Sequence, residues 1–276
     1  TLGLLIPSRW RRLHRKLCVI DGRLAFCGGI NILDDFHDPQ HGPLKHPRLD
    51  FAVCASGALV QQAQEATAQL WWRIQSVRNV RQHDFPHAFS ALRTAGVHLP
   101  WERDSREAGR DGRLVVHAGL LLRDNVLNRS KIERAYRKAI GNARQEILIA
   151  NAYFLPGRKL RKALIHAARR GVKVRLLLQG RYEYFMQFHA SRPVYGALLA
   201  AGVEIHEYTL SFLHAKVAVI DAATDHPWAT VGSSNLDPLS LLLAREANVV
   251  VEDAAFAKGL RARLLQAMQH DSRAVA

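Results

Sequence analysis

The chain has 276 residues, a formal net charge of +15 and a sequence pI near 10.4. It is long enough to bury a sizeable core, and the lack of an apolar run of roughly 18–20 residues argues against a bilayer-spanning helix. The excess of Lys and Arg indicates a polyanionic partner, either an anionic lipid surface or nucleic acid. Three cysteines, an odd count, favour reduced thiols and a cytoplasmic setting.

The first predicted strand carries a reactive pattern. His14-Arg15-Lys16 is followed by four residues, then Asp21, and later by Gly28-Gly29-Ile30-Asn31. His14 and Lys16 are separated by one residue at the start of an alternating apolar run, so in a strand both side chains face the same side. Asp50 stands directly before the next predicted strand, residues 51–54.

The middle of the chain predicts one long helix and a connection. Residues 58–80 have a helical pattern and include the aromatic and basic run Trp71-Trp72-Arg73, a composition that favours a lipid headgroup region. The polar, Arg-rich residues that follow, up to 112, are interpreted as a connection. Within it, 85–89 and 103–112 lack periodicity and are expected to be mobile.

The second half alternates strands and helices. Strands are predicted at 114–118, 146–150, 172–178 and 203–206, and helices from Ser130 by its capping-box spacing, over 159–170, up to Gly202 and over 254–269. This alternation predicts an α/β fold in which helices cover a mixed or parallel sheet.

A second copy of the reactive pattern lies 200 positions after the first. His214-Ala215-Lys216 is followed by four residues, Asp221 and then Gly232-Ser233-Ser234-Asn235. Ten residues rather than six separate the aspartate from the glycine, which we interpret as a longer turn between two strands. Glu246 opens the next predicted strand, as Asp50 does after the first copy. Two copies with the same continuation make a chance match a poor explanation.

The paired residues suit a phosphate diester. Two lysines supply positive charge, while Asn31, Ser233 and Asn235 can donate hydrogen bonds to phosphate oxygens. One His can attack phosphorus to form a phosphohistidine while the other protonates the leaving alcohol. This scheme requires no metal ion or other cofactor, because the lysines and neutral donors balance the charge. Asp50 and Glu246 are placed to orient the two imidazoles.

The duplicated motif resembles the signature of the phospholipase D superfamily. Four segments, 149–154, 167–172, 228–240 and 246–250, make the chain most similar to bacterial cardiolipin synthases of the B type. The resemblance implies two pseudo-repeated halves, each a mixed or parallel sheet flanked by helices, with the active site at their interface. We therefore predict that residues 1–64 are the end of a first half, 65–113 a connecting helix and linker, and 114–276 the second half.

The resemblance also implies a reaction. Two phosphatidylglycerol molecules would yield cardiolipin and glycerol, with His14 as nucleophile, His214 as acid and then base, and Asp50 and Glu246 bonded to the imidazoles. The catalytic motifs comprise His14, Lys16, Asp21, His214, Lys216 and Asp221, although in the family the motif Asp is usually structural. The protein would act as a peripheral protein at the cytoplasmic side of the bacterial inner membrane. The alternatives are a phosphodiesterase or nuclease, and an inactive basic module that binds membranes or nucleic acid.

Two further expectations concern the first half and the substrate pocket. Only 13 residues precede His14, whereas about 100 residues of strands and helices precede His214 in its half, so the first half is expected to lack its front. Thr1 in place of Met agrees with a truncated first half. Tyr153, Phe154 and residues 182–188 are candidates for the apolar walls of a pocket that limits water.

Overall fold

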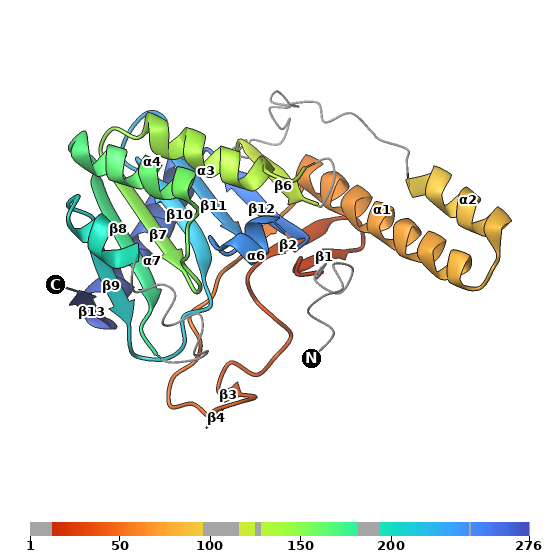
Figure 1. The fold of residues 1–276 in the computed structure, drawn as a ribbon, viewed down its shortest axis with the longest axis horizontal. Helices are drawn as coiled ribbons and strands as arrows, with labels where there is room; N and C mark the ends of the chain where they lie inside the picture. Colours follow the sequence, from red (N-terminus) through yellow and green to blue (C-terminus); the bar gives the residue numbers. More distant parts are fainter. Residues whose placement is uncertain (1–12, 96–115, 125–127, 182–193, 243, 276) are drawn as a thin grey trace. The chain divides into compact units, whose positions relative to one another are not determined.

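The computed structural model describes residues 13–95, 116–124, 128–181, 194–242 and 244–275 (Figure 1). The chain divides into two compact units. The larger comprises residues 1–16, 27–53 and 116–276, and the smaller comprises 17–26 and 54–115. These units have other boundaries than the segments that we derived from the sequence repeat, 1–64, 65–113 and 114–276. The three segments stay a prediction.

An eight-stranded mixed sheet forms the centre of the larger unit. Its order is β13-β9-β8-β7-β10-β11-β12-β6. Strands β7, β8 and β9 are parallel, and every other neighbouring pair is antiparallel. The strands are β6 (Ala118–Arg123), β7 (Glu146–Asn151), β8 (Lys173–Gln179), β9 (Glu204–Tyr208), β10 (Lys216–Ile220), β11 (Trp228–Gly232), β12 (Glu246–Val251) and β13 (Ser272–Val275). The predicted α/β class with a mixed sheet is confirmed.

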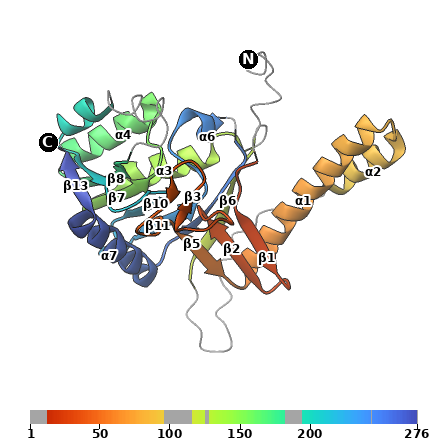
Figure 2. The ribbon, with the colours of Figure 1, turned by 90° about the horizontal axis from the view of Figure 1, so that it is seen from below.

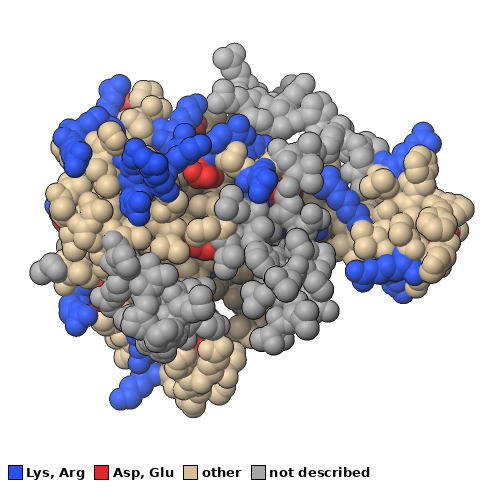
Figure 3. Space-filling model, in the orientation of Figure 1, with Lys and Arg blue, Asp and Glu red and all other residues tan. Residues whose placement is uncertain are grey.

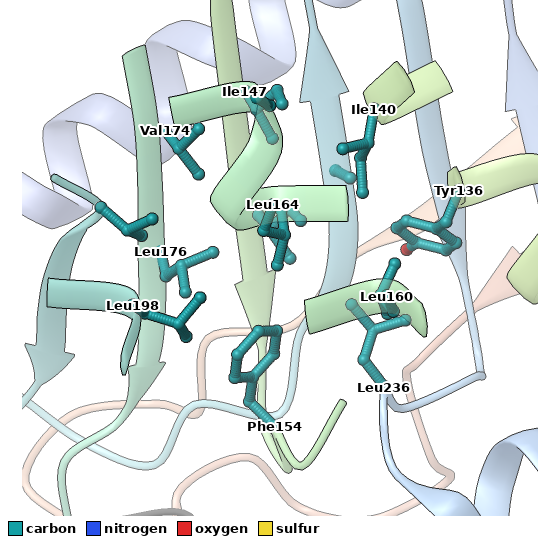
Figure 4. Close-up of a cluster of buried hydrophobic side chains, with 14 of the residues drawn as sticks. Tyr136, Ile140, Ile147, Phe154, Leu160, Leu164, Val174, Leu176, Leu198 and Leu236 are labelled. Carbon is teal, nitrogen blue, oxygen red and sulfur yellow. The ribbon is translucent and has the colours of Figure 1, made fainter. Parts of the chain in front are cut away.

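Helices cover both faces of this sheet. Helices α3 (Lys131–Asn142) and α4 (Arg158–Arg169) lie on one face and α7 (Ala254–His270) on the other, as Figure 2 shows. A short helix, α6 (Pro238–Leu242), precedes β12. Because β7 is buried on both faces, it is apolar without alternation. Ile147 and Ile149 pack with Leu160 and Leu164 in the core beneath α3 and α4 (Figure 4), whereas Leu148 packs on the α7 side.

The smaller unit contains a β-hairpin and two long helices. Strands β1 (Leu17–Ile20), β2 (Leu24–Gly28) and β5 (Ala52–Ala55) form a sheet in that order. Asp21 and Gly22 have φ of 52° and 64°, the two positive values that a tight hairpin turn between twisted strands needs. Helices α1 (Ala58–Arg81) and α2 (Phe85–Ala95) form an antiparallel pair. In the larger unit, β3 (His37–Asp38) and β4 (Gly42–Pro43) form a small ladder.

Two local predictions were wrong, and two local features of the structure were not foreseen. The strand expected at 114–118 is instead β6, which begins at Ala118 because it pairs along its whole length with the distant β12. Residues 85–89 belong to α2, where Asp84 accepts a hydrogen bond from the His87 backbone N–H at 3.3 Å; 103–112 lie outside the described residues. Helix α3 starts where expected, but Ser130 makes no side-chain capping hydrogen bond. Strand β13 had no counterpart in the sequence prediction, because its order depends on pairing with β9.

Candidate active site

The motif His and Lys residues lie at or just before the start of a strand: Lys216 opens β10 and His214 precedes it, while His14 and Lys16 precede β1. Ala218 and Ile220 of β10 pack in the core beneath α3 and α4, so Lys216, which alternates with them, faces the same side. Lys216 is completely buried. Its Nζ donates to the carbonyl oxygen of His214, and Lys16 Nζ donates to that of His14 at 3.1 Å. Each lysine is thereby held beside the histidine of its own motif.

Each histidine is paired with a carboxylate from the other motif copy. His14 Nδ1 lies 3.1 Å from both carboxylate oxygens of Glu246, and His214 Nδ1 lies 2.7 Å from Asp50 Oδ2. The partners are 232 and 164 residues apart in the chain. All four residues belong to the larger unit. The two copies of the motif are therefore interlocked in one site.

The backbone repeats this crossed arrangement. The His14 N–H donates to the carbonyl of Arg245 at 3.0 Å, and the His214 N–H donates to the carbonyl of Leu49 at 2.9 Å. In both cases the acceptor residue directly precedes the carboxylate that holds the imidazole. The same geometry around two separate sequence copies indicates that the copies are structurally equivalent here.

The crossed pairs determine which imidazole nitrogen can react. An ionised carboxylate only accepts hydrogen bonds, so Nδ1 of each ring must carry the hydrogen, and a neutral ring then has its lone pair on Nε2. Burial lowers the pKa of His214, and the hydrogen bond that His214 donates to Asp50 opposes this shift, while the charges of Lys216 and Lys16 add to it. Burial also lowers the pKa of Lys16, against the opposing charges of Glu246 and Asp50.

The neutral donors are arranged differently from our expectation. Ser233 was predicted to donate to phosphate, but its hydroxyl donates to Glu246 Oε2 at 2.5 Å and accepts from the Ala247 N–H at 3.0 Å. Ser233 therefore helps to hold the carboxylate that orients His14. The side chain of Asn235 is buried, and its Oδ1 has no hydrogen-bond partner within the described residues. Asn31 is exposed, and the described residues include no hydrogen-bond partner for its side chain.

The two motif aspartates directly follow a strand, Asp21 after β1 and Asp221 after β10. Asp221 follows the far end of β10, roughly 17 Å along the strand from Lys216. Its carboxylate accepts hydrogen bonds from the backbone N–H groups of residues 144–146, at 2.7–2.9 Å, and it lines a cavity of about 260 Å³ with Lys173 and Arg175. Asp21 lies in the hairpin turn of the smaller unit and shares the φ of 52° that Asp221 has. Asp221 thereby anchors the start of β7, and the grouping of Asp21 and Asp221 with the catalytic residues stays a prediction.

The predicted pocket walls are only partly found. Phe154 is buried in the core beneath α4 (Figure 4), so it supports the site from below and does not face a pocket. Tyr153 is half-buried, and residues 182–188 lie outside the described residues.

Two buried polar side chains were missed by the sequence reasoning. Asn151 is the neighbour of Lys216 in the β7–β10 register; its Oδ1 accepts from the Leu236 N–H at 3.1 Å, and its Nδ2 has no hydrogen-bond acceptor in the described part of the chain. Arg123, 1% exposed, is the neighbour of Glu246 in the β6–β12 register. A polar residue at the end of an apolar strand was the available signal for both.

The described part of the chain lacks two features, a membrane-spanning helix and a cluster of metal ligands. It contains no helix long and apolar enough to cross a bilayer. Within the same residues, no group of three or more His, Cys, Asp or Glu side chains is arranged like metal ligands.

Comparison with known proteins agrees with this geometry. A family model described as cardiolipin synthase, PLD-like domain, matches residues 136–268. Cardiolipin synthase B of Escherichia coli strain K12 is 39% identical over 264 residues, which are 92% of this chain and 55% of that protein. The probable cardiolipin synthase YwiE of Bacillus subtilis strain 168 is 29% identical over 95% of this chain and 47% of its own length. The chain thus spans about half the length of these relatives.

A solved structure supports the fold. Phosphatidylserine synthase from Haemophilus influenzae superposes with a TM-score of 0.64 and 10% sequence identity, covering 95% of this chain and 62% of that one. This likeness concerns the architecture alone. With its duplicated, interlocked His-Lys motifs and its PLD-like domain, the chain belongs to the phospholipase D superfamily, with bacterial cardiolipin synthases among its relatives.

Proposed function

We propose that the protein is a phosphatidyltransferase that makes cardiolipin and glycerol from two phosphatidylglycerol molecules. The observation that carries this proposal is the pair of crossed His–carboxylate contacts with a lysine beside each histidine. The relatives named cardiolipin synthase support the choice of lipid. The protein's partners are then phosphatidylglycerol and an anionic membrane surface, at the cytoplasmic side of a bacterial inner membrane.

The reaction has two balanced steps. In the first, Nε2 of one neutral His attacks phosphorus, the bond from phosphorus to the glycerol oxygen breaks, and the other His, protonated, gives its proton to that oxygen. In the second, the now neutral His takes the proton of a hydroxyl group on a second phosphatidylglycerol, whose oxygen attacks phosphorus and releases the first His. Lys16, Lys216 and the Asn235 amide stabilise the negative charge on the phosphoryl oxygens.

We assign the nucleophile to His14 and the acid and base steps to His214, as the family resemblance implies. The lowered pKa of His214 favours its neutral form, which is the form that a nucleophile needs, and this argues for the reverse assignment. Denaturing quench at alkaline pH during turnover separates the two, because phosphohistidine is stable to base and labile to acid. Phosphate trapped on His14, and lost in His14→Ala, supports our assignment; phosphate on His214 reverses it.

The product assay tests the function itself. The full protein, incubated with phosphatidylglycerol vesicles, is expected to form cardiolipin and free glycerol in equal amounts, with phosphatidic acid as a minor product. His14→Ala and His214→Ala should each reduce the rate by several orders of magnitude. Predominant phosphatidic acid would make the protein a phospholipase, and metal-independent cleavage of DNA or RNA without lipid products would make it a nuclease. A protein without turnover of any phosphodiester would be a binding module.

A further inference from the structure

The helix pair of the smaller unit has its large apolar side chains on the outside. Eight of them are 39–72% exposed: Trp71, Trp72, Ile74, Val77, Val80, Phe85, Phe89 and Leu92. Isolated exposed apolar residues are common on proteins, but a concentration of large ones in a single element marks an interaction site. We call α1 from Leu70 onward, together with α2, the α1–α2 hairpin.

Small residues make the contact between the two helices. Ser76, Ala88 and Ala91 are each less than 8% exposed, and the Ser76 hydroxyl donates to the carbonyl of Ala88 at 2.9 Å. A helix pair designed for water would place its large apolar residues in this contact and its polar ones outside. The hairpin has the opposite distribution, and its outer surface is therefore suited to an apolar environment.

The exposed stripe on α2 is narrow and continuous. Phe85, Phe89 and Leu92 follow each other at four and three residues, so they lie within roughly 60° of the helix circumference. His87, Ser90 and Thr94 occupy the opposite side. One side of α2 is thus apolar and aromatic while the other can stay in water, the distribution expected of a helix lying in a membrane interface.

The charges of the hairpin have one predominant sign. From Leu70 to Ala95 the chain contains four arginines, at positions 73, 78, 81 and 93, and one acidic residue, Asp84, which pairs with His87 at 2.9 Å. On the face seen in Figure 3 the surface of this hairpin is largely uncharged, with separate patches of positive charge. Trp and Phe beside arginine combine a side chain for the acyl boundary with a cation for lipid phosphate.

From this juxtaposition we propose that the α1–α2 hairpin is a membrane-docking element, which inserts its exposed aromatic and aliphatic side chains into the interface of an anionic phospholipid bilayer. A second copy of this chain would bury the apolar residues equally well, but it would bring four arginines of each copy together without acidic partners. An anionic lipid surface neutralises them. The inference deepens the proposed function by naming the element that would bring the protein to its lipid substrate.

Vesicle binding by the full protein tests the proposal. The double variant Trp71→Ser/Phe89→Ser is expected to weaken co-sedimentation with phosphatidylglycerol vesicles by at least about tenfold for each side chain removed. Arg78→Gln/Arg93→Gln should weaken binding by about fivefold per charge on these vesicles and not on phosphatidylcholine vesicles. Leu210→Ser, at a residue of the larger unit that is 39% exposed, is the matched control and should bind normally.

Fluorescence and two substrates complete the test. The chain has five tryptophans. Lipids brominated in the acyl chains should quench its emission, and Trp71→Phe/Trp72→Phe should remove most of the quenching. Turnover of phosphatidylglycerol in vesicles should fall in Trp71→Ser/Phe89→Ser, while turnover of a water-soluble aryl phosphodiester stays unchanged.

Three results would overturn the inference: unaltered vesicle binding by the serine variant, absence of quenching, or an altered oligomeric state of that variant without a change in lipid binding. Cardiolipin synthesis that persists alongside any of these would leave the proposed function standing. Normal hairpin insertion in a protein that makes no cardiolipin would reject the function and retain the docking element.

Discussion

Replacement of Glu246 by Gln tests whether the crossed contacts control the reactivity of His14. The carboxylate of Glu246 is fully buried and accepts hydrogen bonds from His14 Nδ1 and the Ser233 hydroxyl. Gln has nearly the same shape but one acceptor oxygen, so it cannot accept from both donors through separate oxygens. An amide N–H that faces Nδ1 would require the other tautomer of His14, in which the lone pair is no longer on Nε2.

The expected loss of activity is large. In a site where a carboxylate fixes the tautomer of a reacting histidine, its amide analogue costs on the order of 10³–10⁴ in turnover, equivalent to about 4–5 kcal/mol in the barrier. Ser233→Ala removes only one hydrogen bond to the carboxylate and should cost about 1.5–3 kcal/mol, or roughly 10–150-fold. The graded order of the two losses follows directly from the contacts.

Stability must be separated from chemistry. Glu246→Gln also removes one of the two carboxylate charges, with Asp124, that act on the 1% exposed Arg123, and loss of one partner from a buried ion pair costs about 3–5 kcal/mol in unfolding free energy. The double variant Arg123→Met/Glu246→Gln should recover most of this stability, because neither charge is then buried alone. Its activity should stay low, since His14 still lacks its carboxylate.

The assay is the initial rate of cardiolipin formation by full-length variants at 25 °C, with urea unfolding curves for each. Samples quenched with denaturant at alkaline pH report the amount of base-stable, acid-labile phosphohistidine. A Glu246→Gln protein that is folded and within tenfold of the parent rate would refute the claim that this carboxylate sets the tautomer of His14. Recovery of activity together with stability in the double variant would show that Glu246 serves only the fold.

Three further predictions follow from single contacts. Asp221→Asn should lose about 1.5–3 kcal/mol of unfolding free energy, because the Asp221 carboxylate accepts hydrogen bonds from the N–H groups of residues 144–146. Its turnover at 25 °C should be unchanged, and a strong loss of turnover in the folded variant would indicate that Asp221 takes part in catalysis. Gly29→Ala should reduce turnover by about 100-fold with a small change in melting temperature, since its Cβ would lie 2.2 Å from Asp50 Oδ1 and displace the partner of His214; a rate within threefold of the parent would contradict this. Finally, folding lowers the pKa of His214, so the unfolded chain takes up this proton at a higher pH than the folded protein does. The contribution of His214 to the free energy of unfolding is therefore present above the ordinary pKa of 6.5, and it is lost as the pH falls through the folded pKa. Urea titrations at pH 7.5 and 5 should therefore show a smaller acid loss in His214→Gln, and equal losses would count against the burial of this imidazole.

The sequence determined the features that depend on local periodicity and on which residues the motifs contain. The repeated motif was enough to identify the superfamily, although of the second His-Lys pair only Lys216 lies within a strand. Helices α1, α4 and α7 followed from their patterns within one or two residues, because apolar spacing is a property of short segments. The mixed sheet followed from the alternation of these elements.

The tertiary structure decided everything that depends on partners far apart in the chain. Only the fold brings Glu246 to His14 and Asp50 to His214, across 232 and 164 residues, and no local pattern encodes such a crossing. The same holds for β6, whose position depends on its pairing with β12. It also holds for Ser233, which was expected to donate a hydrogen bond to phosphate but donates to Glu246 in the fold. A motif specifies which groups are available, but the hydrogen bonds of a buried polar group depend on the strands that pack around it.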